Sequence, residues 1–417
     1  MRKVQCVIIG GGSAGLAAAI ELKKNGIDDI LVLEKGSEVG GILNQCIHNG
    51  FGLHEFKEEL SGPAYAERFA NQAKELGIPI ECQTTVTAFY PDKTLEVSNT
   101  DGYEVIQADA VVLAMGCQER TSGQIQIPGM RPQGVYTAGT AQRYVNLDGY
   151  QIGKKVFILG SGDIGLIMAR RMTLEGAKVL GVAELMPYSN GLQRNIVQCL
   201  KDYDIPLYLS HTVTNIEGFP RLEKVTISEV DENRQPIPGT EKVFEVDTLL
   251  LSVGLVPDNT LTVEAGINLD LRTRGIEVNE LCESLMPGVF ACGNVLHVHD
   301  LVDYVTAEGR KAGLGAVRYL KGELPERKGF TTKAGNGVSY VLPQRVDYPS
   351  EDETVEFSFR VRTPYKNATV VVKNGEEEVK RIKKLALLPA EMEKVILPKE
   401  VLTTIQNELV IEIEEGQ

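Results

Sequence analysis

VIIGGGSAG, residues 7–15, is an apolar strand that runs into a glycine turn. Gly10, Gly12 and Gly15 give the spacing G-x-G-x-x-G, and residues 16–24 continue as an alanine-rich helical pattern. The first glycine permits a tight turn, the second lets backbone N–H groups approach a pyrophosphate, and the third allows close packing of helix on strand. Because the helix N-terminus also offers N–H donors and a positive dipole, the stretch predicts a dinucleotide-binding βαβ unit.

The remainder of such a unit follows, and the chain then repeats it. A second apolar run, residues 30–33, ends at Glu34, where a carboxylate can accept hydrogen bonds from ribose hydroxyl groups. Residues 156–184 repeat the whole unit, glycine spacing and terminal acid included. Residues 109–116 and 247–254 also repeat one another, each as an apolar run that ends in a small-residue turn. The chain is therefore predicted to carry two dinucleotide-binding units, each with a closing strand.

The segment after the second unit indicates how the two units are connected. Residues 288–294 read as a short strand and turn, and a helix is predicted over residues 303–320, with small residues that allow close backbone approach. We expect this segment to return to the first domain, so that the second domain is an insertion. The predicted domains are residues 1–118 with 255–327, residues 119–254, and residues 328–417.

The C-terminal segment has a different pattern. Apolar and charged residues alternate in short runs separated by turn signals. These runs are residues 337–346, 353–362, 368–373, 380–386, 392–396 and 409–414. They predict an antiparallel β-sandwich, so the fold class is α/β with two Rossmann-like domains and a small C-terminal β-sandwich. A docking role and a purely stabilising role for the sandwich remain open.

Composition excludes several functional classes. The chain has 43 basic and 57 acidic residues and a formal net charge of −14, which disfavours binding to nucleic acid or anionic membranes. No apolar run of membrane length and no targeting segment is visible, so a cytoplasmic location is expected. The 7 cysteines and 5 histidines lack the spacings of a disulfide framework or of common zinc motifs, so no metal site is expected.

These motifs resemble those of the two-dinucleotide-binding-domain flavoproteins, which include thioredoxin reductase and other pyridine nucleotide-disulfide oxidoreductases. The resemblance covers about residues 1–325 and rests on both glycine motifs, the 40–41 and 114–116 turns and the 288–294 segment. It implies FAD in the first unit and NAD(P)H in the inserted one. The FAD-binding residues implied are Gly10, Gly12, Ser13, Ala14, Gly15, Glu34, Lys35, Gly41, Ala114, Gly116, Gly293, Asn294 and Thr306. The NAD-binding residues implied are Gly160, Gly162, Asp163, Ile164, Gly165 and Glu184.

Two segments resemble a narrower group. Residues 40–52 and 292–300 are similar to those of bacterial FAD/NAD-binding oxidoreductases related to the hydrogen cyanide synthase B and opine oxidase A subunits. Members of that group commonly accompany a glycerol-3-phosphate dehydrogenase-like flavoprotein. The resemblance therefore implies a subunit of a dehydrogenase complex, which exchanges electrons between NAD and a second flavoprotein, in a homo- or hetero-oligomer.

Two departures from the wider family refine the chemistry. Disulfide reductases need two neighbouring cysteines, but the loop after Gly41 offers only Cys46 and residues 137–155 offer none. A dithiol reductase is therefore disfavoured. Glu184 would accept a hydrogen bond from a ribose 2′-hydroxyl and repel a 2′-phosphate, and only Arg194 follows it closely, so NADH is favoured over NADPH.

The candidate catalytic side chains are few because the cofactors supply most of the reactivity. They are Cys46, His48, His297 and His299. The two later histidines belong to a His-x-His-Asp run, for which proton transfer near the flavin and polar capping of the following helix are both open. Two alternatives to an electron-transferring oxidoreductase also remain: a non-catalytic nucleotide-binding assembly subunit, and an NADH-dependent peroxide or disulfide reductase that uses Cys46.

Overall fold

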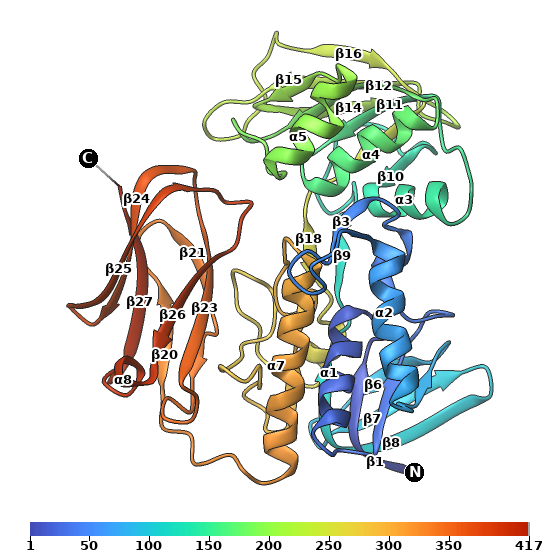
Figure 1. The fold of residues 1–417 in the computed structure, drawn as a ribbon. Coiled ribbons are helices and arrows are strands. Elements are labelled where there is room, and N and C mark those ends of the chain that lie inside the picture. The colour runs from blue at the N-terminus through green and yellow to red at the C-terminus, as the bar shows by residue number, and fades with distance from the viewer. Residues whose placement is uncertain (416–417) are drawn as a thin grey trace. The chain divides into compact units, whose positions relative to one another are not determined.

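The computed structural model describes residues 1–415, and its chain divides into two compact units (Figure 1). The first unit contains Met1–Cys117 and Pro257–Gln417, and the second contains Gln118–Val256. The second unit is therefore inserted into the sequence of the first. Within residues 1–415, every helix is too short or too polar to cross a membrane.

The sheet of the first unit is mixed. Its strand order is β5-β2-β1-β8-β7-β6, and β19 pairs with β8. The strands are β1 (Arg2–Ile9), β2 (Ile30–Leu33), β5 (Ile80–Glu81), β6 (Thr85–Phe89), β7 (Thr94–Asn99), β8 (Gly102–Leu113) and β19 (Val289–Ala291). Strands β1, β2, β8 and β19 run parallel, whereas β6 and β7 are antiparallel. The predicted closing strand and the last strand of the antiparallel ribbon are not separate elements. Both belong to the single long strand β8.

Strand β1 shows why both faces of this sheet are covered. Ile8 packs with the helices on one face, whereas Val7 and Ile9 pack with the antiparallel ribbon and residues 261–296 on the other. The helices are α1 (Ser13–Lys24), α2 (Gly62–Glu75) and α7 (Val302–Leu320); shorter elements are η1 (Gly41–Gln45), β3 (Asn49–Phe51), β4 (Leu60–Ser61), α6 (Thr260–Glu264) and η3 (Gly293–Val295). Burial on both faces explains the continuous apolar runs of the parallel strands.

Helices α1 and α7 pack closely side by side (Figure 1). A side chain at Gly309 would place its Cβ 2.3 Å from the carbonyl oxygen of Ala14, and one at Gly313 would lie 2.7 Å from that of Ala18. The small residues predicted along residues 303–320 therefore bring the α7 backbone against α1. This packing returns the segment that follows the inserted unit to the first sheet.

The second unit repeats this architecture. Its parallel sheet has the order β10-β17-β11-β12-β13, and a separate antiparallel sheet has the order β14-β15-β16. These strands are β10 (Val135–Thr137), β11 (Lys155–Leu159), β12 (Lys178–Glu184), β13 (Leu207–Leu209), β14 (His211–Glu217), β15 (Lys224–Glu229), β16 (Lys242–Glu245) and β17 (Thr248–Leu251). The helices are α3 (Ala138–Asn146), α4 (Asp163–Leu174), α5 (Gln193–Cys199) and η2 (Lys201–Tyr203). The helices and the antiparallel sheet pack against separate apolar clusters.

The predicted C-terminal sandwich is confirmed, except that one of its strand pairs is parallel rather than antiparallel. Its sheets have the orders β22-β20-β27-β24-β25 and β21-β23-β26. The elements are β20 (Phe330–Ala334), β21 (Val338–Leu342), β22 (Arg345–Val346), β23 (Thr354–Val361), β24 (Tyr365–Asn374), β25 (Glu377–Leu387), β26 (Glu393–Pro398), α8 (Lys399–Leu402) and β27 (Glu408–Glu414). The prediction of one strand over residues 337–346 was wrong, because Pro343 lacks the N–H group that a continuous ladder needs. Strand β20 was missed.

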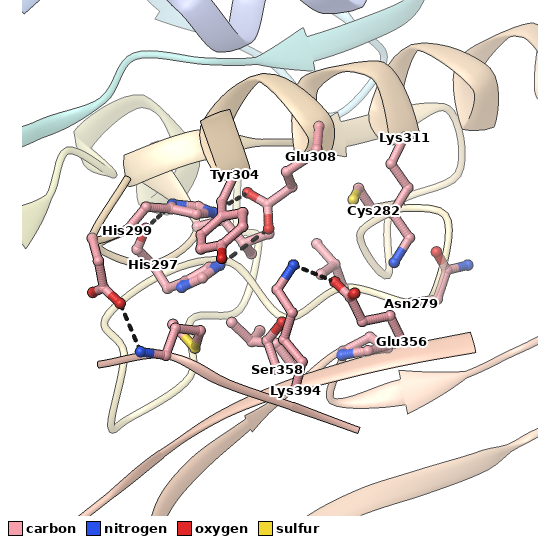
Figure 2. Close-up of a pocket in the computed structure, with 17 residues that line it drawn as sticks. Asn279, Cys282, His297, His299, Tyr304, Glu308, Lys311, Glu356, Ser358 and Lys394 are labelled. Atoms are coloured by element: carbon pink, nitrogen blue, oxygen red, sulfur yellow. Dashed lines mark hydrogen bonds and ion pairs between the residues drawn. The ribbon is translucent and has the colours of Figure 1, made fainter. Parts of the chain in front are cut away.

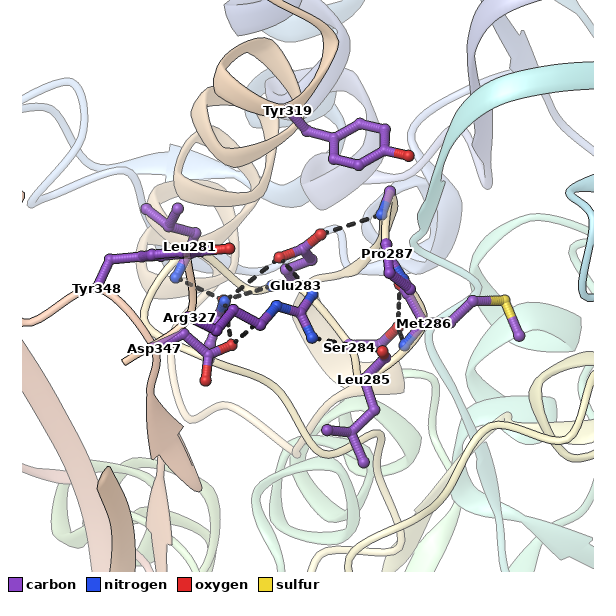
Figure 3. Close-up of polar contacts among 12 residues, drawn as sticks. Leu281, Glu283, Ser284, Leu285, Met286, Pro287, Tyr319, Arg327, Asp347 and Tyr348 are labelled. Atoms are coloured by element: carbon purple, nitrogen blue, oxygen red, sulfur yellow. Dashed lines mark hydrogen bonds and ion pairs between the residues drawn. The ribbon is translucent and has the colours of Figure 1, made fainter. Parts of the chain in front are cut away.

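A network of charges, in which the carboxylates are buried and Arg327 is partly exposed, ties the sandwich to the rest of the first unit (Figure 3). Arg327 lies 2.9 Å from the carboxylate of Glu283 and 3.5 Å from that of Asp347. Glu283 also accepts the N–H of Gly288 at 3.0 Å, and Asp347 accepts the amide of Asn279 at 3.0 Å. Each carboxylate thus has a charged and a neutral donor, as a buried ion pair requires.

The contact between α1 and α7 gives a direct test. Glycine to alanine normally stabilises a helix, but Gly309→Ala would push a methyl group into the backbone of Ala14. We expect a loss of about 1–3 kcal/mol in the free energy of unfolding, measured by chemical denaturation. Gly123→Ala is the control, because its nearest atom lies at 3.8 Å, and it should change stability by less than about 0.5 kcal/mol. Equal stability of Gly309→Ala and the parent protein would contradict the packing.

Candidate functional site

The turns that follow β1, β2, β8 and β19 lie at one edge of the first sheet, because these strands are parallel. Gly10 has φ +111°, and a Cβ there would lie 2.4 Å from the carbonyl oxygen of Ala114. A Cβ at Gly15 would lie 1.9 Å from the carbonyl oxygen of Gly10. The structure therefore brings the first glycine motif and the Ala114–Gly116 turn into contact, with no room for a side chain at either glycine.

The next feature is the space in front of α1. A Cβ at Gly12 would meet no atom within 4 Å, and α1 has neither a side-chain cap nor an acidic residue in its first turn. Gly41 lies beside this turn, since its Cβ position is 3.4 Å from the Cα of Gly12. Ser13 and Ala14 form the start of the helix. An uncapped helix N-terminus bordered by glycines fits the diphosphate of a dinucleotide.

Glu34 follows β2, and its carboxylate is fixed by the backbone. It accepts the N–H of Gly11 at 2.8 Å and the N–H of Gly36 at 2.6 Å, one on each oxygen. Each oxygen keeps a further lone pair for a ribose hydroxyl group. Lys35 is exposed. This arrangement suits the predicted role of Glu34 as an acceptor of hydrogen bonds from ribose hydroxyl groups.

The Gly293–Asn294 turn lies against the start of α1. Gly293 has φ +75°, and its Cβ position is 2.9 Å from the Cβ of Ala14. The Asn294 side-chain oxygen accepts the backbone N–H of His299 at 3.1 Å, so this side chain orders the loop that follows. Thr306 is buried inside α7 and shares a 2.7 Å hydrogen bond with the hydroxyl of Tyr65. Its side chain is thus held within the protein.

The second unit has an equivalent glycine turn. Gly160 has φ +97°, and its Cβ position is 2.0 Å from the carbonyl oxygen of Ser252; that of Gly165 is 2.8 Å from the carbonyl oxygen of Gly160. Unlike α1, helix α4 begins with an acid, Asp163. Gly162 precedes it, and Ile164 is partly buried. The Asp163 carboxylate accepts the backbone N–H of Leu192 at 2.8 Å, which fixes the loop before α5.

Glu184 ends β12 and is 4% exposed. One oxygen accepts the N–H and hydroxyl of Ser161 at 2.9 and 2.6 Å, and the other accepts the N–H of Met186 at 2.9 Å. The structure also adds a cation that the sequence analysis missed. Burial raises the pKa of Tyr188, Arg234 lowers it and Glu184 raises it further, so Arg234 lies near Tyr188, four residues after Glu184 in the chain.

Cys46 and His48 follow η1. The Cys46 thiol donates to the carbonyl oxygen of Ile42 at 3.3 Å, and burial raises its pKa to about 12. The thiol is therefore protonated at neutral pH, whereas nucleophilic cysteines react as thiolates. His48 lies against Phe51, with 5.0 Å between ring centroids.

His297 and His299 form one cluster with Glu308, and Figure 2 shows both imidazoles turned toward this carboxylate. The Nε2 atom of His297 is 3.1 Å from one oxygen, and that of His299 is 3.4 Å from the other. Burial lowers the pKa of His297 to about 4. Burial raises the pKa of Glu308, but the two histidines outweigh it and hold this pKa well below its ordinary value.

Asp300 has a different role from either expectation for the His-x-His-Asp run. Its carboxylate pairs with Arg360 of the sandwich and accepts the N–H of Met392 at 2.6 Å. The prediction that this residue caps the following helix was wrong. Leu301 is the N-cap of α7, and no side chain forms a capping hydrogen bond with this helix. Asp300 instead fastens the loop to the sandwich.

Sequence reasoning missed Glu308 and Arg360. Glu308 stands within the small-residue stripe that packs α7 onto the protein, and an acid at such a position is the signal that could have found it. Arg360 had no such signal, because its partner lies 60 residues away in sequence.

Comparisons with known proteins agree with this geometry. Residues 4–309 match the family model of the pyridine nucleotide-disulphide oxidoreductases. The thioredoxin reductase of T. acidophilum is 25% identical, with a TM-score of 0.62, and the match covers 76% of this chain and 98% of that one. The C-terminal sandwich lies beyond the family match.

Two relatives of known name are similar in sequence. The glutamate synthase (NADPH) small chain of Halomonas elongata is 26% identical over 341 residues, which cover 75% of this chain and 67% of that one. The hydrogen cyanide synthase subunit HcnB of Pseudomonas protegens is 25% identical over 316 residues, which cover 69% and 65%. The chain therefore spans about two thirds of the length of these relatives. It belongs to the pyridine nucleotide-disulphide oxidoreductase family, a family of oxidoreductases that bind FAD and NAD(P)H.

Proposed function

We propose that this protein is a flavin-dependent NADH oxidoreductase that passes electrons between NAD(H) and a partner flavoprotein or a small acceptor. The observation that carries the proposal is the repeated glycine turn. At both Gly10 and Gly160, a Cβ atom would collide with a carbonyl oxygen of the turn that follows the closing strand. Two such turns in one chain fit two dinucleotides. FAD and NADH would supply the redox chemistry, and the chain would position them.

The residues of the first unit would hold FAD by its polar parts. The backbone N–H groups at the start of α1 would bind the diphosphate, and Glu34 would accept hydrogen bonds from the ribose. Gly41 and Gly293 border this start of α1 without adding side chains. The second unit would hold NADH through the Gly160–Gly165 turn and Glu184 in the same manner.

We assign NADH as the preferred nucleotide on the basis of Glu184. Its carboxylate has one lone pair left on the oxygen that accepts Met186, which suits a ribose hydroxyl and repels a phosphate. Arg234 is the counterargument, because its charge acts on Tyr188, four residues after Glu184, and a guanidinium that reached the ribose could accept a 2′-phosphate. Glu184 therefore favours NADH and Arg234 favours NADPH. A substitution at Glu184 shows which of the two side chains sets the nucleotide preference.

The proposed partner is a second flavoprotein subunit, of the glycerol-3-phosphate dehydrogenase type. The names of two relatives, a small chain and a subunit of larger enzymes, support a role within a complex. The proposed docking element is the C-terminal sandwich, which lies outside the part of the chain that matches the family. If the chain is instead only an assembly subunit, its nucleotides will be bound but will not turn over.

Cofactor analysis tests the proposal first. The purified protein, once denatured, should release one FAD per chain, identified by its absorption spectrum and by chromatography. An adenine nucleotide in place of FAD would favour the assembly subunit and overturn the proposed oxidoreductase.

Glu184→Gln tests the nucleotide preference. The amide keeps the size of the side chain but removes the charge that favours a ribose hydroxyl, so the KM for NADH should rise about 10-fold and the preference for NADH over NADPH should fall. Steady-state kinetics with both nucleotides measure this. Glu175→Gln is the control, because Glu175 pairs with Arg171 at the other end of α4 and should leave both KM values unchanged. A wild-type preference for NADPH, or an unchanged preference in Glu184→Gln, would contradict the assignment.

Cys46 is tested separately. With a pKa of about 12, only about one thiol in ten thousand is ionised at pH 8, and the thiolate fraction rises about tenfold per pH unit. NADH-dependent reduction of peroxide or coenzyme A disulfide should therefore not depend on this residue. Turnover that is present in the wild type and in Cys82→Ser, yet lost in Cys46→Ser, would show that the thiol is a redox centre.

A further inference from the structure

His297, His299 and Glu308 form a cluster whose side chains have no part in the dinucleotide binding proposed above. Two of its members lie on the loop after η3 and the third lies on α7, two residues after the buried Thr306. One nitrogen from each histidine and one carboxylate oxygen all lie within 4.8 Å of one another. A metal ion at about 2.0–2.2 Å from each ligand requires atoms about 3–4 Å apart, so only a small contraction separates the cluster from a coordination site.

The hydrogen bonds around His299 place two hydrogen-bond acceptors, its Nε2 atom and the Glu308 carboxylate, next to each other. Its Nδ1 atom is 3.0 Å from the backbone carbonyl oxygen of His297, which can only accept, so Nδ1 carries a proton. In the neutral imidazole, Nε2 then carries a lone pair, and this lone pair faces the carboxylate of Glu308 at 3.4 Å. Two acceptors that face one another need a cation or a proton between them.

His297 adds a second unsatisfied atom. Its side chain is 3% exposed, and its Nδ1 atom has no hydrogen-bond partner. Its Nε2 atom faces Glu308. A buried imidazole usually satisfies both nitrogens, whereas this ring satisfies only Nε2, the nitrogen that faces Glu308 and would be the ligand.

The surroundings orient the ligands as metal sites do. The Nδ1–H of His299 is held by the His297 carbonyl and lies 3.3 Å from the oxygen of Asn294, while Glu308 accepts the N–H of Gly293 at 2.6 Å. Such outer contacts fix the tautomer of a ligating histidine and the direction of its lone pair. They also link the cluster to the Gly293–Asn294 turn.

The cluster has an open side. A cavity of about 110 Å³ borders all three side chains and is lined further by Lys311 and Lys394 (Figure 2). Lys394 is paired with Glu356 at 2.8 Å. Three protein ligands and an open side match the sites in which an ion keeps one position for water or a small anion.

We propose that His297, His299 and Glu308 bind one divalent transition-metal ion, with its remaining coordination positions open to this cavity. Two imidazoles and one carboxylate are the donor set of catalytic zinc sites and of non-haem iron(II) sites, whereas calcium and magnesium prefer oxygen ligands alone. The sequence analysis expected no metal because the histidines lack a familiar spacing. The third ligand comes from a helix, which spacing rules do not cover.

Zinc binding to the full-length flavoprotein tests the site. The protein is stripped with a chelator, dialysed against Zn²⁺, and its bound metal is measured by mass spectrometry. We expect one Zn²⁺ per chain in the wild type and at least about 10-fold weaker binding in His299→Ala and Glu308→Gln. His211→Ala is the matched control, since His211 is a buried histidine beside Lys242 in the second unit, and it should bind as the wild type does.

Two results would overturn the proposal. One is wild-type binding no tighter than that of His299→Ala, which would show that an imidazolium–carboxylate pair fills the cluster instead. The other comes from X-ray absorption of the zinc-loaded wild type, which keeps the test valid if a variant fails to fold. Nitrogen and oxygen ligands at about 2.0–2.1 Å with two imidazole signatures are expected, whereas sulfur at about 2.3 Å would place the ion on cysteines.

Discussion

The contact of the Gly10 turn with the backbone of Ala114 is the constraint on which the first unit depends. At this point the end of β1, the end of β8 and the start of α1 approach so closely that a single methyl group at Gly10 or Gly15 would collide with a carbonyl oxygen. The same approach leaves the front of α1 bare and uncapped. A helix terminus with free N–H groups is thereby created at the edge of the sheet where the other turns also end.

The second unit obeys the same constraint with different atoms. Gly160 and Gly165 meet the backbone and Cβ of Ser252, which stands where the first unit has Ala114. Packing of helix on strand requires these glycines in both units. The two units could therefore be aligned residue by residue from the sequence. The long apolar runs of the parallel strands were predictable for a related reason, since burial on both faces removes the alternation of polar residues.

Other features depend on contacts between distant segments and left little trace in the sequence. Strand β20 is short and partly polar, and it is fixed by pairing with β22 and β27 rather than by its own pattern. Arg360 meets Asp300 because the sandwich packs against the loops of the first unit, and Arg327, just before the sandwich, meets Glu283 in one of these loops. Glu308 was hidden for another reason: helical spacing brings it to two histidines that were considered separately. In each case a contact with another segment of the chain, not a local preference, decides the position.

The central claim is that the two nucleotide units act together as a flavin-dependent NADH oxidoreductase. The most direct measurement is an anaerobic titration of the purified flavoprotein with NADH, followed by its absorbance near 450 nm. If the claim is correct, about one equivalent of NADH should remove the oxidised flavin band, because NADH delivers two electrons and FAD accepts two. A spectrum that stays oxidised in excess NADH would contradict it.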